Sequence, residues 1–503
     1  MDTNPVLHIK NQSHPPAPLY GAFSFQKTGI VLTYRAMLFC SHVFIFVFLP
    51  IVLAGFFIIG RVARAEWARL WLVLASFVFY AWFKLDFLWI ILVSIAVNYA
   101  CVYAMERGHF KKPLMWLGIL FNLGLLGWFK YAMFVLANLN GAFGTEFAIR
   151  EIVLPLGISF FTFQQIACLV DLCKPGETPK YTLLNYTLFV TFFPQLVAGP
   201  IVRHHEMMPQ FDVRENTKPD GLNLAAGLHL FAGGLFKKLV IADFLAKWAH
   251  NGMGTWDRLP ELTFWQAWFS VVSYMFQVYF DFSAYSDMAM GLGRMFNIRL
   301  PVNFNSPYRA CNIKEFWQRW HMTLGHFLMT YLYFPLGGSR KGEARAYANL
   351  FTVFLLCGIW HGATWTFVLF GALHGLAMAF HRAWGKLGYS LPRLLAWPLT
   401  FVFLAFTYAP ARCAELGHVF RIWRGMFAPK AFDLASVAKI TQPVDMPWLW
   451  LAAVFAIVLC FPNSAGRDKN FQPTLANGIA TVALLTVAVL HISRLSPFLY
   501  FNF

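Results

Sequence analysis

Long apolar runs recur along most of the chain, and within each run the apolar residues are continuous rather than alternating with polar ones. A helix needs about 20 apolar residues to cross the hydrocarbon core of a bilayer. Membrane β-strands would instead alternate apolar and polar positions. The pattern predicts an all-α, polytopic integral membrane protein with about ten to thirteen helices, some of them short or re-entrant. The clearest predicted spans are residues 39–60, 67–83, 87–104, 113–137, 346–380, 391–408, 447–461 and 476–492.

Composition supports this class. Only 13% of the 503 residues are charged, whereas soluble domains carry roughly 25%. The net charge of +17 comes from basic residues in short loops rather than along one stripe. Arg61 and Arg64 lie in one such loop, and Arg107, Lys111 and Lys112 lie in another, so the positive-inside rule places both loops in the cytoplasm. The expected partner is the lipid bilayer, and no nucleic acid is expected.

The chain divides into two parts. Residues 1–36 contain four prolines and no run long enough to span a membrane, so we expect a disordered extension or a start-site artefact, with Met37 as the functional start. No removable signal peptide is expected. Residues 37–503 are predicted to form a single transmembrane domain. Within it, residues 297–342 combine prolines, paired glycines and charges, which membrane depth tolerates only where the backbone is buried in protein or lines a cavity.

Two histidines are the leading candidates for chemistry. His361 lies in a Trp-His-Gly triplet inside the apolar stretch 350–376, and His321 lies on the apolar side of a helix predicted over residues 313–333. A lone buried histidine is usually a core residue that bonds to backbone. Two costly imidazoles, each following a tryptophan, Trp360 or Trp320, favour proton chemistry or a polar ligand.

Other polar groups leave alternatives open. Asp281 and Asp287 either steady a histidine or cap a broken helix. Arg203 follows a proline-interrupted apolar segment and either anchors a helix or binds a phosphate of a donor.

No metal site is expected, since no pair of histidines on one helix turn accompanies a carboxylate. The further histidines are His326, His374 and His381, and the eight cysteines are expected to be buried, unpaired thiols.

Seven ordered strings resemble the membrane-bound O-acyltransferases, most closely the bacterial alginate O-acetylase branch. They are LPLGISFFTFQ (154–164), FFPQLVAGPIVR (192–203), DFSAYSDMAMG (281–291), NFNSPYRA (303–310), FWQRWHMTL (316–324), YFPLGG (333–338) and GIWHGATWTFVLFGALHG (358–375). The resemblance implies a ring of tilted helices with re-entrant segments around a central reaction chamber. It places the family's catalytic histidine at His361 and its second signature histidine at His321.

The resemblance also implies an activity. An O-acetyltransferase of the bacterial inner membrane would move acetyl groups from acetyl-CoA, with no bound cofactor, to an exopolysaccharide such as alginate or cellulose. A periplasmic acetyltransferase partner within a polysaccharide synthesis and secretion complex would complete the transfer. The candidates for substrate or donor binding are Trp360, Trp320, Arg203, Asp281, Asp287 and Asn305. Two other classes stay open: a secondary transporter that exports an acyl donor or polysaccharide precursor, and a non-catalytic scaffold.

Overall fold

The computed structural model describes residues 37–148, 151–174, 181–254, 261–492 and 498–499. The predicted N-terminal extension lies outside these residues. Every regular element in the described part of the chain is a helix, which confirms the all-α prediction. All eight cysteines carry free thiols, as expected, and five of them are buried. The expectation of burial is wrong for Cys460, which is exposed, and for Cys173 and Cys311, which are partly exposed.

Most helices are α-helical, and four short π-helical segments continue them. The α-helices are α2 (Leu49–Val62), α3 (Ala65–Ala81), α4 (Leu85–Glu106), α5 (Lys111–Leu126), α6 (Ala132–Phe143), α7 (Ile158–Asp171), α8 (Leu183–Thr191), α9 (Phe193–Leu196), α10 (His204–Asp212), α11 (Gly221–Phe236), α12 (Asp243–Met253), α13 (Phe264–Met295), α14 (Ile313–Arg319), α15 (Met322–Leu328), α16 (Glu343–His361), α17 (Trp365–Gly385), α18 (Arg393–Arg412), α19 (Leu416–Phe427), α20 (Pro447–Cys460), α21 (Ser464–Lys469) and α22 (Leu475–Leu490). The π-helices are η1 (Phe44–Phe48), η2 (Gly127–Tyr131), η4 (Lys237–Ala242) and η6 (Met329–Tyr333), and short 3₁₀ turns are η3 (Arg214–Thr217), η5 (Pro307–Arg309), η7 (Leu434–Lys439) and η8 (Pro443–Asp445).

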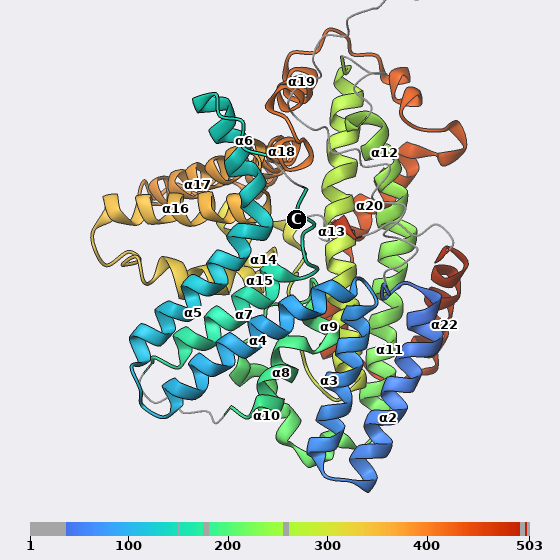
Figure 1. Cartoon of the computed structure of the whole chain (residues 1–503). Helices are drawn as coiled ribbons and strands as arrows, with labels where there is room; N and C mark the ends of the chain where they lie inside the picture. Colours follow the sequence, from blue (N-terminus) through green and yellow to red (C-terminus); the bar gives the residue numbers. More distant parts are fainter. Residues whose placement is uncertain (1–36, 149–150, 175–180, 255–260, 493–497, 500–503) are drawn as a thin grey trace, which may run out of the picture.

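Helix α13 forms the centre of the fold, and nearly all of its residues are buried. Thr263 and Gln266 start it with a capping box, in which each side chain bonds to the backbone N–H of the other. Helices α11, α12, α18 and α19 pack around it, as Figure 1 shows. The blue and cyan helices α2 to α5 lie in the lower part of the view, with α4 and α5 extending to the left, and α16 and α17 run side by side on the left above them.

Five helical segments in the described residues are long and apolar enough to cross a membrane. They are Phe44–Val62, Leu85–Glu106, Lys111–Phe143, Gly221–Met253 and Arg393–Arg412. Three further apolar helices, α7, α20 and α22, are shorter. The multi-pass architecture is thereby confirmed, and the larger number of spans expected from the apolar runs stays a prediction.

Three predicted elements differ from the structure. The apolar run 346–380 is a hairpin of two helices, α16 and α17, rather than one span. The helix predicted over residues 313–333 is broken at His321, whose φ of 44° is left-handed. Conversely, the two aspartates 281 and 287 lie within the continuous helix α13, so they cap no broken helix. Hydrophobic periodicity reports which residues are buried but does not detect a break whose flanks are equally apolar.

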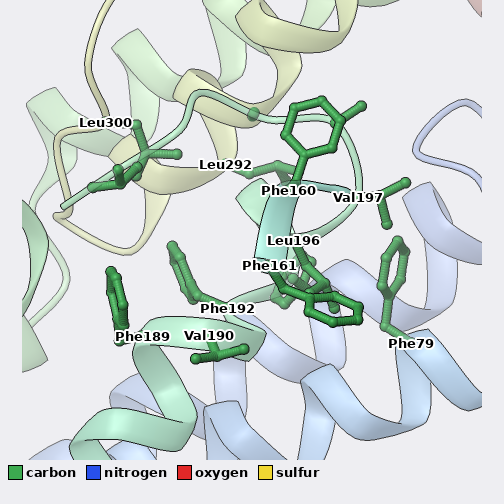
Figure 2. Packing of buried hydrophobic residues seen from close by; sticks show 14 of the residues in the cluster. Phe79, Phe160, Phe161, Phe189, Val190, Phe192, Leu196, Val197, Leu292 and Leu300 are labelled. Carbon is green, nitrogen blue, oxygen red and sulfur yellow. The ribbon is translucent and has the colours of Figure 1, made fainter. Parts of the chain in front are cut away.

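The string 192–203 is irregular and deeply buried. Phe192 ends α8, the single turn α9 follows, and an extended segment leads to Arg203. Figure 2 shows Leu196 beside the ring of Phe161 of α7, within a buried apolar cluster that also contains Phe192 and Phe79 of α3. The hydroxyl of Thr323 accepts a hydrogen bond from the backbone of Ile201 at 3.0 Å. Protein therefore surrounds this irregular backbone and satisfies part of it, as membrane depth requires.

Candidate active site

His361 is the last residue of α16, and its side chain is only 7% exposed. Its Nδ1 lies 2.7 Å from the carbonyl oxygen of Cys357, one turn earlier. Because a carbonyl oxygen only accepts, Nδ1 must donate, so in the neutral ring the lone pair is on Nε2. Burial favours this neutral form, since a buried charge is costly. Local helix geometry therefore sets the tautomer that a general base requires.

The glycine of the Trp-His-Gly triplet has a packing role. Gly362 has an extended backbone that any residue can adopt, but a Cβ there would collide with the ring of Phe367 in α17. The ring of Phe367 also lies parallel to the imidazole of His361, with centroids 6.4 Å apart. A side chain at position 362 would therefore displace a ring that packs beside the imidazole.

His321 joins α14 to α15 and is 1% exposed. Its Nδ1 lies 3.1 Å from Oδ1 of Asn303, which also accepts hydrogen bonds from the backbone and hydroxyl of Thr323. The backbone carbonyl of Asn303 accepts from Met322 at 2.9 Å. Asn303 thus stabilises both the break between α14 and α15 and the orientation of the His321 ring. With Nδ1 as the donor, His321 adopts the same tautomer as His361.

Trp360 lies between the two imidazoles. Its ring centroid is 4.7 Å from that of His361 and 6.5 Å from that of His321. Phe163 of α7 stacks on the indole at 5.1 Å, and Phe160 meets it edge-on. The structure therefore brings His361, His321 and Trp360, predicted from two apolar segments, into one buried aromatic cluster.

Two residues at the end of α16 were missed from the sequence. Within the π-helix η2, Lys130 donates a hydrogen bond through Nζ to the carbonyl of Trp360, and the hydroxyl of Tyr131 donates to that of Ile359 at 3.1 Å. These carbonyls belong to the last turn of α16, where helix geometry leaves such groups without helical partners. A lysine in the apolar run 113–137 was the available signal, because ionisable side chains in spans usually have a function.

His374 of α17 has a structural explanation. The indole N–H of Trp317 donates to its Nδ1 at 3.2 Å, so Nε2 must donate to the hydroxyl of Thr407, 3.1 Å away. That hydroxyl in turn donates to the carbonyl of Leu404. Both ring nitrogens are therefore engaged in joining α14, α17 and α18.

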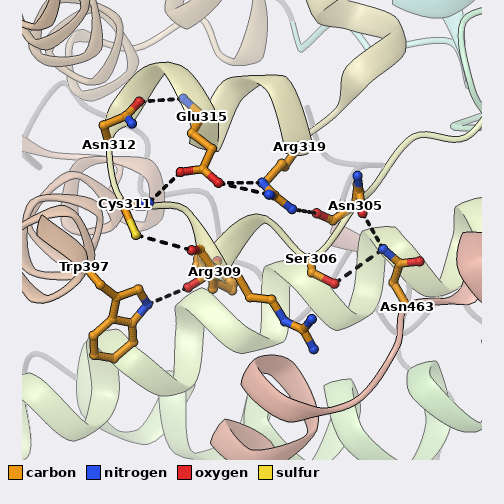
Figure 3. Close-up of polar contacts among 10 residues, drawn as sticks. Asn305, Ser306, Arg309, Cys311, Asn312, Glu315, Arg319, Trp397 and Asn463 are labelled. Atoms are coloured by element: carbon orange, nitrogen blue, oxygen red, sulfur yellow. Dashed lines mark hydrogen bonds and ion pairs between the residues drawn. The ribbon is translucent and has the colours of Figure 1, made fainter. Parts of the chain in front are cut away.

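Three predicted binding residues lie elsewhere. Trp320 stacks on Phe316 within an aromatic core. The guanidinium of Arg203 lies 3.7 Å from Glu206 at the start of α10, which matches the anchoring alternative. The side chain of Asn305 accepts from Asn463 at 2.6 Å, as Figure 3 shows.

The backbone around Asn305 has its own role. Asn305 and Arg319 exchange hydrogen bonds through the N–H and carbonyl of Asn305, and Glu315 pairs with Arg319 at 2.9 Å (Figure 3). These contacts fasten the extended segment 303–306 to α14. They fix the non-helical segment from which the side chain of Asn303 reaches His321.

Asp281 and Asp287 pair with consecutive lysines of the π-helix η4. Asp281 lies 2.7 Å from Lys238 and accepts the backbone N–H of Leu499. Asp287 lies 2.6 Å from Lys237. Neither carboxylate is hydrogen-bonded to His321 or His361 in the contacts of the described residues, so they tie η4 to α13 instead of steadying a histidine.

These features define a multi-pass helical membrane protein with two buried imidazoles of one tautomer around a tryptophan. The profile of the membrane-bound O-acyltransferase family matches residues 174–413. A peptidoglycan O-acetyltransferase of Helicobacter pylori is 40% identical over 94% of this chain and 99% of its own length. A protein of Azotobacter vinelandii named "Probable alginate O-acetylase AlgI" is 34% identical over 93% of this chain and 100% of its own.

A teichoic acid D-alanyltransferase of Bacillus subtilis is also similar, at 30% identity over 50% of this chain and 67% of its own length. The chain belongs to the membrane-bound O-acyltransferase family. It is an acyltransferase enzyme of the membrane, as the resemblance of its sequence strings implied.

Proposed function

We propose that this protein is an inner-membrane O-acetyltransferase that takes acetyl groups from acetyl-CoA and directs them to hydroxyls of an extracytoplasmic glycan. The observation that carries the proposal is the hydrogen bond from His361 to the carbonyl of Cys357, which leaves the lone pair on Nε2. A positioned imidazole base contributes roughly 10²–10⁴ in rate. The names of relatives that act on peptidoglycan and alginate support a glycan as the final acceptor.

The proposed reaction is a direct acyl transfer. Nε2 of His361 takes the proton of the attacking hydroxyl while its oxygen bonds to the acetyl carbonyl carbon. The tetrahedral adduct then collapses, the carbon–sulfur bond breaks, and the leaving thiolate takes the proton from Nε2. His321 orients the donor from its place across Trp360. The hydroxyl belongs to a periplasmic partner protein, which passes the acetyl group to the polymer within a synthesis and secretion complex.

Replacing the proposed base tests the activity. We expect His361→Ala to lower acetylation of the cell's glycans at least about 100-fold while membrane levels stay normal. The measurement is the O-acetyl content of exopolysaccharide and peptidoglycan in cells whose only copy is the variant. His326→Ala is the matched control, because that imidazole is exposed on α15. Acetylation at the wild-type rate in His361→Ala would contradict the proposal.

The competing class is a secondary transporter. It is distinguished from the enzyme by whether acetyl transfer requires a gradient across a membrane. Purified protein in detergent sustains no gradient, so label moving from acetyl-CoA to a hydroxyl acceptor supports the enzyme. If label transfer requires sealed vesicles with a proton gradient, the transporter is favoured. A scaffold would tolerate the loss of one imidazole and would therefore keep acetylation in His361→Ala.

A further inference from the structure

The indole N–H of Trp360 is a buried donor that no acceptor in the described part of the chain satisfies. The side chain is only 8% exposed. Buried indole N–H groups usually find a partner. In this chain Trp71, Trp397 and Trp423 donate to backbone carbonyls at 3.0, 2.8 and 2.9 Å. Trp360 departs from that rule, and its ring lies beside the imidazoles of both His361 and His321.

The surroundings of Trp360 hold the ring in place and favour negative charge beside it. Phe163 covers one face, and the imidazole of His361 meets the ring nearly edge-to-face. The amino group of Lys130 donates to the backbone carbonyl of Trp360, and its Nζ lies 5.4 Å from the indole centroid. No carboxylate forms an ion pair with Lys130 among the described residues. In either protonation state the amino group keeps N–H donors beside Trp360, and donors fixed in an apolar site stabilise negative charge that develops nearby.

We infer that the indole N–H of Trp360 is the oxyanion donor of the acyl transfer, with Lys130 as the residue that positions it. The inference rests on the proposed function. When the hydroxyl oxygen bonds to the carbonyl carbon of an acyl thioester, the carbonyl π electrons move onto its oxygen. That oxyanion accepts the Trp360 hydrogen bond until the carbon–sulfur bond breaks and the carbonyl re-forms. The donor and the base, His361, are consecutive residues, so one helix end delivers both.

Removing only the N–H tests the inference. Trp360→Phe keeps an aromatic ring against Phe163, and a benzothiophene analogue of tryptophan at position 360 keeps the whole shape with sulfur in place of N–H. Loss of one oxyanion donor costs about 10²–10³ in kcat. We expect both variants to lose that much in transfer of labelled acetyl from acetyl-CoA to glycan in membrane vesicles. KM for acetyl-CoA should change less than about threefold, because the oxyanion exists only in the transition state.

The matched control is Trp365→Phe. Its indole N–H has a partner within the protein, Oδ1 of Asn138 at 2.9 Å, and the residue is exposed at the start of α17. We expect this variant to keep kcat within about twofold of wild type. Lys130→Met should lower kcat without raising KM, and Lys130→Arg, which retains a cationic donor, should restore part of the rate.

The two proposals fail in different ways. If the benzothiophene variant transfers acetyl at the wild-type kcat, the oxyanion role is wrong, whatever Trp360→Phe does. If His361→Ala remains active, the proposed function itself is wrong. If the benzothiophene variant has the wild-type rate and His361→Ala is inactive, only the inference about Trp360 is overturned.

Discussion

At the residue scale, Asn303 determines the geometry of His321. One carboxamide oxygen accepts from His321 and twice from Thr323 in a fully buried setting. A positive φ at a histidine costs energy and persists only where the surroundings enforce it. The asparagine therefore holds a left-handed break that the local sequence does not favour.

We predict that Asn303→Leu lowers acetyl transfer at least about tenfold and destabilises the protein by about 1–3 kcal/mol, because it leaves buried donors without an acceptor. Glycan O-acetyl content and the thermal midpoint in detergent measure the two effects. Asn305→Ala is the control, since that side chain makes its hydrogen bond to Asn463 at an exposed position. Equal losses in both variants would show that the segment matters only as a whole.

The sequence identified the histidines whose burial is costly, but not the residues that form hydrogen bonds to them and fix their orientation. His361 and His321 were predictable because an imidazole in an apolar run needs an explanation. Asn303 was not, because it depends on a chain break that no hydrophobic period marks. Asn305, two positions away, was chosen from the same string and proved to bond to Asn463 instead.

At the element scale, α16 and α17 form a close-packed hairpin that presents His361. A Cβ on Gly358 would collide with the backbone of Gly371, and one on Gly371 would collide with carbonyls of α16. The far end is clamped by Glu343, which pairs with Arg382 and Lys386, both at 2.9 Å. Hydrogen bonds from these two cations lower the pKa of Glu343 to about 2, so the clamp stays ionised at physiological pH.

We predict that Gly371→Val separates the two helices and lowers acetyl transfer at least about tenfold, with a stability loss of about 1–3 kcal/mol from overpacking. The thermal midpoint and the transfer rate are the measurements. Gly385→Ala on the same helix is the control, because a Cβ there meets nothing within 4 Å. An unchanged rate in Gly371→Val would show that the hairpin spacing does not position His361.

Apolar runs predicted most of the long helices to within a few residues, including α4 and α18. They failed at breaks such as Gly362–Thr364, because the flanks are as apolar as a single span would be. The π-helix η2 was equally hidden, since one inserted residue leaves composition unchanged. This π-helix affects the site because it directs Lys130 and Tyr131 toward the end of α16.

At the scale of the whole molecule, the charged loops predict which side of the membrane each end of the site faces. Arg61 lies in the last turn of α2 and Arg64 directly precedes α3, while Arg107 follows α4 and Lys111 and Lys112 begin α5. Both connections lie toward the lower end of the view in Figure 1, whereas α6 ends near the top. A single orientation therefore satisfies the positive-inside rule for both basic loops.

This orientation is testable with single cysteines in a Cys460→Ser background, which removes the exposed native thiol. We predict that a membrane-impermeant maleimide labels Glu146→Cys, beyond α6, in intact spheroplasts, and labels Arg64→Cys only after the inner membrane is opened. Each position is exposed, so access rather than burial decides labelling. The reverse pattern would place the basic loops outside. It would also contradict the proposed use of cytoplasmic acetyl-CoA, because that proposal requires a donor that enters from the side of Arg64.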